Sequence, residues 1–474
     1  MQFRGGFTPP SLLGSFRDAS QHFYIPGGCL SAALPKVAIV GSGVSGLAAA
    51  HALRSQADIT LFEAGSYFGG HTHTVDITLP TPGGPVSHGV DTGFLVFNER
   101  TYPKLIALFA ELGVETALSD MSFSVKAPGA APDKSLEWSG SSLNSVFAQR
   151  GNILNWKFLR MLRDIVRFNR ITTALAESVL DAGMQQPLVD FLRVHAFSAE
   201  FRDWYFLPMM GCIWSCPTDQ MLQFPVATMI RFCHNHGLIQ ITNRPQWRTV
   251  SGGARHYVEK IVAGITDKRL NSPVLRIERD AHSAHGGVLL ATQGAVERFD
   301  KVVLATHSDQ SLALLATNAS PAERKVLGAI RYQPNRAVLH TDSSVLPQKK
   351  LAWAAWNYER APHTDRESDG ERPGVCLHYL LNLLQPLPFT QPVLVSLNPA
   401  RAIAPQHVLG EYDYTHPVFD LAATQAQKDL PDLQGLQHTY FCGAWTGYGF
   451  HEDGLKSGLQ AAQLLLERYL QVAA

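Results

Sequence analysis

Two histidines, His71 and His73, stand one residue apart after a glycine pair in the stretch FGGHTHT. Imidazoles at this spacing can bind a transition metal, but a metal centre needs further ligands that suit the ion and its geometry. The other candidates, Cys212 with Cys216 and the run from Cys233 to His236, lack a companion pair at zinc-site spacing. We therefore predict no metal site and expect the neighbouring glycines to indicate the chemistry.

The loop GSGVSG has the spacing G-x-G-x-x-G, with Gly41, Gly43 and Gly46 as its glycines and Ser45 inside it. An apolar run typical of a β-strand, KVAIV, precedes the loop, and a helical pattern follows it. The first glycine permits a tight turn, the second lets the backbone approach a diphosphate, and the third lets helix and strand pack closely. Free N–H groups and the helix dipole favour an anion at this helix N-terminus.

A carboxylate, Glu63, closes the next strand pattern, DITLFEA, twenty residues beyond Gly43. A carboxylate at this place accepts hydrogen bonds from the ribose of a dinucleotide. Strand, glycine loop, helix, strand and acid thus occur in the order of a dinucleotide-binding βαβ unit. The sequence predicts an adenine dinucleotide as cofactor, either FAD or NAD.

The continuation YFGGHTHTVD, which contains Gly69 and Gly70, resembles the flavin amine oxidase and phytoene desaturase superfamily. In that superfamily a glycine pair shortly after the ribose-binding acid continues the FAD site. Many members carry Arg after the pair, where this chain carries His71. The resemblance implies FAD, bound non-covalently because the loop after Gly443 contains no cysteine for a covalent link.

Two further segments resemble parts of the same FAD site. The end TYFCGAWTGYGFHEDGLKSGL reads as a strand, a loop and a long amphipathic helix, and the resemblance implies that Gly443 approaches the cofactor. Main-chain donors and the dipole at the helix N-terminus would stabilise negative charge on the reduced ring. The resemblance gives this role to the N–H groups of Gly454 and Leu455, with Ser457 in the same turn. It also implies a main-chain contact of Val274 to adenine.

A narrower likeness covers nearly everything after Pro35. The stretches VDTGFLVFNERTYPKL, RPQWRTVSGGARHYVE and GYGFHEDGLKSGL resemble a bacterial group of NAD/FAD-binding proteins often called amine oxidases. Some members of that group are associated with cyclopropane-type fatty acyl synthases, and desaturation of a methylated acyl chain on the way to furan fatty acids is assigned within it. The resemblance therefore implies an acyl lipid or another apolar small molecule as substrate.

The expected fold class is α/β, with a Rossmann-like FAD-binding domain that is discontinuous in sequence and a mixed α+β substrate domain. We assign residues 35–95, 245–320 and 430–474 to the FAD-binding domain, and residues 96–244 and 321–429 to the substrate domain. The pattern of residues 152–240 is helical, while LAWAAWNYE, VCLHYLL and PVLVSLNP predict an antiparallel sheet. Residues 1–34, rich in Gly, Pro and Ser, predict a flexible extension.

The composition excludes some classes of protein. Hydrophobic residues make up 45% and charged residues 17% of the 474 residues, as in globular chains that bury substantial cores. Lys+Arg and Asp+Glu both total 40, so no global charge favours nucleic acid as a partner. No apolar run reaches the roughly 18 residues that span a bilayer, and the start lacks the apolar core of a signal peptide. With six scattered cysteines, these features predict a cytoplasmic protein with reduced thiols.

The segment from Trp156 to Arg170 predicts an amphipathic helix with Arg160, Arg163, Arg167 and Arg170 along one face. Such a helix can lie on an anionic membrane, so one interpretation is a peripheral contact with the inner membrane surface; an ordinary solvated face is the other. The stretch WYFLPMMGCIWSCP, rich in aromatic and sulfur side chains, fits either the adaptable wall of an apolar pocket or ordinary core packing.

Three functions fit this set of motifs. The first is an FAD-dependent oxidoreductase that removes hydride from an unsaturated or methylated fatty acyl chain and so desaturates or isomerises it. The second is amine oxidation with release of hydrogen peroxide, and the third is a non-catalytic flavin-binding scaffold. Candidate proton acceptors beside FAD-site segments are His71, His73, Tyr448 and His451. Because alternate residues of an extended segment point oppositely, we expect one of the first two to face the flavin.

Overall fold

The computed structural model describes residues 34–128, 135–177, 186–214, 218–239, 244–280, 286–360 and 375–473. The chain divides into two units, residues 1–34 and 35–474, and every feature below belongs to the second. The predicted flexible extension, apart from Leu34, lies outside the described residues, and so does Cys216. Within the described ranges, no helix is long and apolar enough to cross a lipid bilayer.

A five-stranded parallel sheet carries the predicted glycine loop. Its strand order is β10-β2-β1-β14-β20. The strands come from three separate parts of the chain: β1 (Lys36–Val40), β2 (Asp58–Phe62), β10 (Asp267–Arg269), β14 (Lys301–Leu304) and β20 (Thr439–Phe441). Val37 of the central strand β1 pairs with Ile59 on one side and Lys301 on the other. Parallel strands are buried on both faces, which explains why KVAIV is apolar almost throughout.

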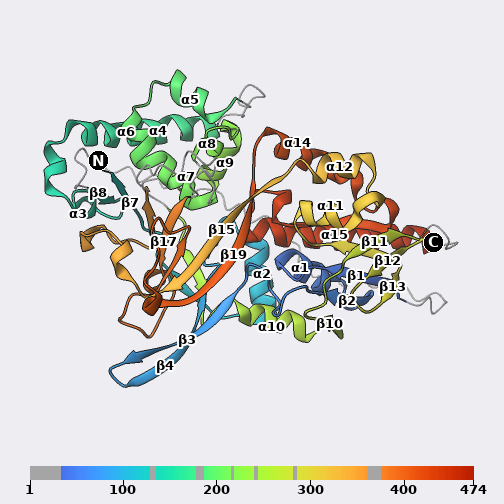
Figure 1. Ribbon diagram of the computed structural model, residues 1–474. Coiled ribbons are helices and arrows are strands. Elements are labelled where there is room, and N and C mark those ends of the chain that lie inside the picture. Colours follow the sequence, from blue (N-terminus) through green and yellow to red (C-terminus); the bar gives the residue numbers. More distant parts are fainter. Residues whose placement is uncertain are drawn as a thin grey trace, which may run out of the picture. The chain divides into compact units, whose positions relative to one another are not determined.

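Two layers cover this sheet, and Figure 1 shows α1 and α15 beside β1 and β2. Ile39 and Leu61 face the helices of one layer: α1 (Val44–Leu53), α2 (Pro103–Leu112), α10 (Arg255–Ala263) and α15 (His451–Ala473). Ala38 and Phe62 face the other layer: β11 (Arg276–Arg279), β12 (Val288–Ala291), β13 (Val296–Phe299), α11 (Ser308–Leu315), α12 (Pro321–Leu327) and α14 (Leu421–Asp429). Alternate residues of one strand thus enter different cores. The fold class is α/β, as predicted, although α12 and α14 come from segments that the predicted boundaries give to the substrate domain.

A seven-stranded mixed sheet forms a second core with the order β19-β15-β18-β17-β16-β7-β8. Its strands are β7 (Phe123–Pro128), β8 (Ser135–Ser139), β15 (Arg331–His340), β16 (Trp356–Glu359), β17 (Cys376–Leu380), β18 (Leu394–Leu397) and β19 (Val408–Val418). Only β16 and β7 pair in parallel. The predicted antiparallel sheet is confirmed, because β16, β17 and β18 are adjacent and antiparallel.

The helical part of the chain shares a hydrophobic core with this sheet. Its helices are α3 (Leu143–Val146), the 3-10 helix η1 (Arg150–Leu154), α4 (Trp156–Glu177), α5 (Leu188–Val194), α6 (Ala199–Phe201), the π-helical turn η3 (Arg202–Phe206), α7 (Leu207–Trp214), α8 (Thr218–Met221) and α9 (Val226–Asn235). Smaller elements complete the unit: the hairpin of β3 (Thr74–Thr81) and β4 (Gly84–Asp91), the sheet of β5 (Phe97–Asn98), β9 (Trp247–Val250) and β6 (Thr116–Ser119), and the short helix α13 (Leu381–Leu384).

Candidate active site

The G-x-G-x-x-G loop joins β1 to α1 at the carboxyl edge of the parallel sheet. Gly41 has a φ of +100°, and a Cβ there would lie 2.9 Å from the carbonyl oxygen of Ala305. A Cβ on Gly46 would lie 1.9 Å from the carbonyl oxygen of Gly41, so only glycine lets α1 begin this close to β1. Apart from its chain neighbours, no described residue has an atom within 4 Å of the Cβ position of Gly43, which lines a cavity. The second glycine therefore leaves room for a bulky group against the backbone.

Glu63 lies beside this loop and also lines the cavity. Its Oε2 accepts hydrogen bonds from the backbone N–H and the hydroxyl of Ser42 at 3.0 and 2.5 Å, and its Oε1 accepts one from the N–H of Gly65 at 2.8 Å. These bonds hold the carboxylate in place and leave lone pairs for a ribose hydroxyl. Val274 also lines the cavity, from the irregular segment that precedes β11.

The second glycine pair packs directly on the first loop. Gly69 and Gly70 have φ values of +125° and +58°. The N–H of Gly69 donates to the carbonyl oxygen of Ser42 at 3.1 Å, and a Cβ on Gly70 would lie 3.2 Å from the Cα of Gly43. The two glycine motifs thus form one continuous surface.

The C-terminal helix differs from the expectation in one respect. Gly443 lines the cavity, and its N–H donates to the hydroxyl of Ser457 at 2.9 Å. The N–H of Gly454 donates to the carbonyl oxygen of Phe450 at 3.1 Å, and the side chain of Leu455 is buried in the core. Neither Gly454 nor Leu455 lines the cavity, so the expected donation of their N–H groups to a ring is wrong. The physical reason is that α15 begins at His451, so the N–H of Gly454 is already used inside the helix.

His71 and His73 have different surroundings. His71 lines the cavity, and burial together with the neighbouring His307 lowers its pKa to about 4. The Nε2 of its ring is buried without a hydrogen-bond partner among the described residues. His73 does not line the cavity; its Nδ1 hydrogen-bonds to Thr92 at 3.0 Å, and its ring stacks on Tyr67 at 4.2 Å. The histidine that faces the cavity is therefore His71.

Besides His71 and His236, the cavity lining contains three histidines: His307, His416 and His451. The ring centroids of His307 and His416 lie 6.2 and 5.4 Å from that of His71. Burial lowers the pKa of His307 to about 4 and that of His416 and His451 to about 3, so all four rings are neutral at pH 7. The Nε2 of His451 is engaged by the hydroxyl of Tyr257 at 2.6 Å, whereas the Nε2 of His71 is buried and has no hydrogen-bond partner among the described residues.

His307 and His416 were not among the site residues predicted from the sequence. His307 follows the carboxyl end of β14, where ligands bind in open α/β sheets, so this position could have been inferred. His416 lies in the long strand β19, where no local signal distinguishes it.

The cavity has a volume of about 740 Å³ and extends from the glycine loops into the second core. The far part is apolar, with walls from β7 and the residues just before it, from α7 and α9, and from the loop before α15: Met121, Phe123, Met209, Ile213, Trp214, Phe232 and Phe450. Trp445 and Tyr448 also line the cavity. The stretch WYFLPMMGCIWSCP serves both predicted roles, since Met209 and Trp214 line the cavity while Phe206 is buried in the core.

Among the described residues, Glu63 is the only carboxylate in this lining, and no Lys or Arg contributes to it. The few polar groups of the apolar part are neutral. The Nε1 of Trp356 is a buried donor that has no partner in the described part of the chain, and the Nδ1 of His236 hydrogen-bonds to the carbonyl oxygen of Phe232 at 3.0 Å. Burial lowers the pKa of His236 to about 4, so this ring is also uncharged at pH 7.

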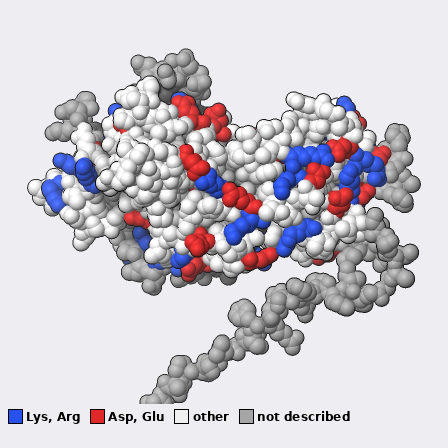
Figure 2. Space-filling model, turned by 90° about the horizontal axis from the view of Figure 1, so that it is seen from below, with Lys and Arg blue, Asp and Glu red and all other residues white. Residues whose placement is uncertain are grey.

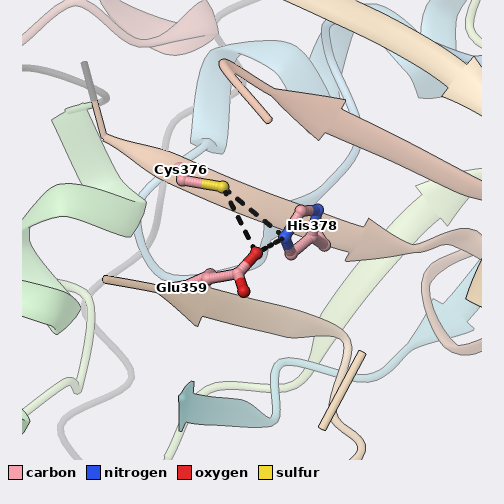
Figure 3. Close-up of side chains that lie close together, drawn as sticks. All are labelled: Glu359, Cys376 and His378. Atoms are coloured by element: carbon pink, nitrogen blue, oxygen red, sulfur yellow. Dashed lines mark hydrogen bonds and ion pairs between the residues drawn. The ribbon is translucent and has the colours of Figure 1, made fainter. Parts of the chain in front are cut away.

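A separate polar cluster, shown in Figure 3, has residue types that bind metals: Glu359, Cys376 and His378. The Nε2 of His378 lies 3.0 Å from Oε2 of Glu359 and 3.5 Å from the sulfur of Cys376. Trp356 and Tyr379 line the cavity from the same two strands. Because side chains alternate along a strand, Glu359 and His378 point to the opposite face of the sheet, away from the cavity.

A continuous chain of hydrogen bonds links this cluster to the neighbouring strands. The N–H of Asp342 donates to Nδ1 of His340 at 3.1 Å, so the proton of that neutral ring lies on Nε2, which donates to the hydroxyl of Ser396 at 2.7 Å. The hydroxyl of Ser396 then donates to Nδ1 of His378 at 2.6 Å, and Nε2–H of His378 donates to Glu359. A metal bound to Nε2 of His378 would move the proton of that ring to Nδ1 and so reverse every donor and acceptor along the chain. The Nδ1 of His340 would then carry a proton and could no longer accept from the N–H of Asp342. Lys126 completes the cluster with an ion pair to Glu359 at 2.8 Å.

The sheet, the two glycine motifs and the carboxylate beside them define a dinucleotide-binding α/β protein with an adjoining apolar cavity. The profile of the family described as flavin containing amine oxidoreductase matches residues 44–380, and the chain belongs to this family. It is an FAD-dependent oxidoreductase, and FAD is normally bound non-covalently in this family. The cradle at Gly43, the free start of α1 and Glu63 fit the diphosphate and ribose of that cofactor.

Solved structures of several oxidoreductases share this fold. Cyclohexylamine oxidase from Brevibacterium oxydans IH-35A has a TM-score of 0.63 and 18% identity, over 92% of this chain and 100% of that chain. A fatty acid isomerase from P. acnes that produces CLA has a TM-score of 0.61 and 16% identity, over 91% and 98% of the two chains. Putrescine oxidase bound to putrescine has a TM-score of 0.60 and 16% identity, over 92% and 100%. No curated protein matches the sequence.

Proposed function

We propose that this enzyme desaturates or isomerises an uncharged fatty acyl chain, unsaturated or methylated, that lies in the apolar part of the cavity. The observation that carries the proposal is the absence of charge in that lining, beyond the carboxylate at the ribose end, among the described residues. An aromatic and methionine wall suits a flexible hydrocarbon, whereas burying a charged group there without a partner costs free energy. The likeness of the fold to a fatty acid isomerase supports the same substrate class.

The chain supplies positioning and a proton acceptor. FAD, when bound, supplies the two-electron acceptor for a hydride. The apolar walls hold the acyl chain and exclude water, which fixes the C–H bond to be broken. The ring of His71 is neutral at pH 7 because its pKa is lowered to about 4, and its Nε2 has no hydrogen-bond partner among the described residues. We therefore assign the role of proton acceptor to this nitrogen. A base this weak suffices if hydride leaves first, since a C–H bond next to the resulting positive carbon is strongly acidic.

Amine oxidation is the second candidate, favoured by the family and by the two aromatic residues Trp445 and Tyr448 in the lining. Trp445 is buried, and its Nε1 donates to the carbonyl oxygen of Thr306 at 3.1 Å, so the ring is fixed. An amine would have to enter in its neutral form, because no carboxylate of the described residues lies in the apolar part.

The experiment is anaerobic flavin reduction followed at 450 nm, with acyl lipids and with amines of matched chain length as two separate panels. Reduction or isomerised product with acyl lipids alone supports the proposal. Reduction by amines, with hydrogen peroxide released when oxygen is admitted, replaces it with amine oxidation. If neither panel acts while dithionite still reduces the flavin, the protein is a flavin-binding scaffold and the proposal fails.

A further inference from the structure

The start of α4 and the two short helices before it expose several large apolar side chains. Leu154 is 90% exposed, Leu143 80% and Trp156 62%. We call this surface the α4 patch; its apolar members are Leu143, Ile153, Leu154, Trp156, Leu159 and Val166. Single exposed apolar residues are common, but a cluster of this kind marks an interaction site.

The helical period explains why these side chains point outward. Phe158, Met161 and Phe168 of α4 are fully buried in the second core. Leu159 and Val166 lie on the opposite side of the helix, and the basic residues Arg160, Arg163 and Arg170 share that side with them. The exposed face of α4 is thus a mixture of apolar and basic residues.

The α4 patch carries basic charge without exposed acid. Its basic members, Arg150, Lys157, Arg160, Arg163 and Arg170, are all exposed. Between Leu143 and Ala176 the only Asp or Glu is Asp164, which is buried and accepts a hydrogen bond from the N–H of Ser198 at 3.0 Å. On the face seen in Figure 2, the left end, where α3 lies in Figure 1, shows Lys and Arg atoms but no Asp or Glu atoms.

The predicted basic stripe is corrected at one position. Arg167 pairs with Asp164 at 3.2 Å, and its guanidinium lies 4.3 Å from the ring centroid of Phe197. It therefore holds α4 against the rest of the core and does not belong to the exposed face.

We propose that the α4 patch docks the protein peripherally on an anionic lipid surface. Leucine and tryptophan side chains insert into the boundary between headgroups and acyl chains, while arginine and lysine reach the phosphates. A second copy of this chain is a poorer occupant, because a symmetric contact through the same patch would bring basic side chains against basic side chains. This inference does not depend on the proposed substrate.

The test is flotation of the full chain, loaded with FAD, with vesicles of phosphatidylcholine alone or with added phosphatidylglycerol. One pair of variants addresses charge: Lys157→Glu/Arg160→Glu in the patch and Lys260→Glu/Lys428→Glu, exposed residues elsewhere, as the control with the same change in net charge. A second pair addresses insertion: Leu154→Asp in the patch and Leu436→Asp, half-exposed in another part of the unit, as its control. Flavin content and melting temperature verify that each variant is folded.

We expect the wild type to float with anionic vesicles and to remain in solution with neutral ones. Each basic residue near an anionic surface contributes about fivefold to binding, so the patch charge variant should bind at least about tenfold more weakly, whereas its control should bind nearly as well as the wild type. Leu154→Asp should also bind more weakly than Leu436→Asp. The proposal fails if the wild type does not float, if both charge variants lose binding equally, or if Leu154→Asp only converts a dimer into a monomer on a sizing column.

Discussion

Gly458 of α15 packs directly on Ser45 of α1: a Cβ at position 458 would lie 2.1 Å from the carbonyl oxygen of Ser45. One turn earlier, a Cβ on Gly454 would lie 2.7 Å from Cγ1 of Val44. The helix that ends the chain therefore rests on the helix whose N-terminus forms the diphosphate cradle, and two glycines permit this close approach.

Gly458→Ala should push α15 away from α1. We expect a loss of about 1 to 3 kcal/mol in the free energy of unfolding, because the added methyl meets backbone that cannot move aside. Urea denaturation with and without FAD measures this loss. Gly140→Ala is the matched control, since its Cβ position has no atom of another described residue within 4 Å apart from its chain neighbours; equal stability of the two variants would contradict the tight packing.

His71→Ala should lower turnover by about 10² to 10⁴, the usual contribution of a proton acceptor. FAD should remain bound, because the glycine loops and Glu63 are untouched. His73→Ala is the comparison, since His73 does not line the cavity. Turnover is followed with whichever substrate reduces the flavin, and similar losses in the two variants would count against the assignment of His71.

Glu63→Gln should weaken FAD binding by tenfold or more. The amide keeps the size of the side chain but replaces one acceptor oxygen with an NH₂ donor and removes the negative charge. The side chain can then no longer accept hydrogen bonds from Ser42, Gly65 and a ribose at the same time. Titration of the apoprotein with FAD, followed by flavin fluorescence, gives the dissociation constant. Asp58→Asn changes an exposed carboxylate at the start of β2, the strand directly before Glu63, and should leave the dissociation constant unchanged.

Acidification should destabilise the protein between pH 6.5 and about 4. Six histidines have pKa values lowered by burial to about 4 or 3: His71, His236, His307, His340, His416 and His451. In this window the unfolded chain binds protons that the folded chain does not, so stability falls as pH falls. Burial raises the pKa of Asp91 and Asp453 to about 6, so in this window the folded chain binds protons at these two carboxyl groups that the unfolded chain does not. This raises stability as pH falls, but the six histidines outnumber the two carboxyl groups.

Each proton in excess changes the free energy of unfolding by about 1.4 kcal/mol per pH unit. Urea midpoints measured from pH 7.5 to 4.5 should therefore decrease steadily below pH 6.5. A constant or rising midpoint would show that the histidines are not held neutral in the folded protein.

Metal removal should have no effect. The Glu359, Cys376 and His378 cluster is satisfied by its own hydrogen bonds, so chelators should change neither the melting temperature nor the activity. Glu359→Gln should destabilise the fold by about 1 to 3 kcal/mol, because Lys126 loses its charged partner and His378 loses an ionic acceptor. Stoichiometric zinc that disappears in Cys376→Ala would overturn this account.

The sequence alone determined the parts of the protein that depend on local chemistry. A strand, the loop with Gly41, Gly43 and Gly46, a helix and Glu63 specify a dinucleotide site, because the turn, the helix N-terminus and the acid all lie within thirty residues. The resemblance to the flavin amine oxidase and phytoene desaturase superfamily identified the dinucleotide as FAD and indicated the family of the chain. The antiparallel strands of the second sheet were readable from their alternating and apolar patterns.

Only the tertiary structure decided what surrounds the flavin site. His71, His307, His416 and His451 come from four distant segments, and no local pattern says that they share one cavity. The choice between His71 and His73, the use of the N–H of Gly454 inside α15, and the chain that links His378 to His340 depend on how separate elements pack. Short-range spacing specifies backbone conformation, but contacts between residues hundreds of positions apart exist only once both cores have formed.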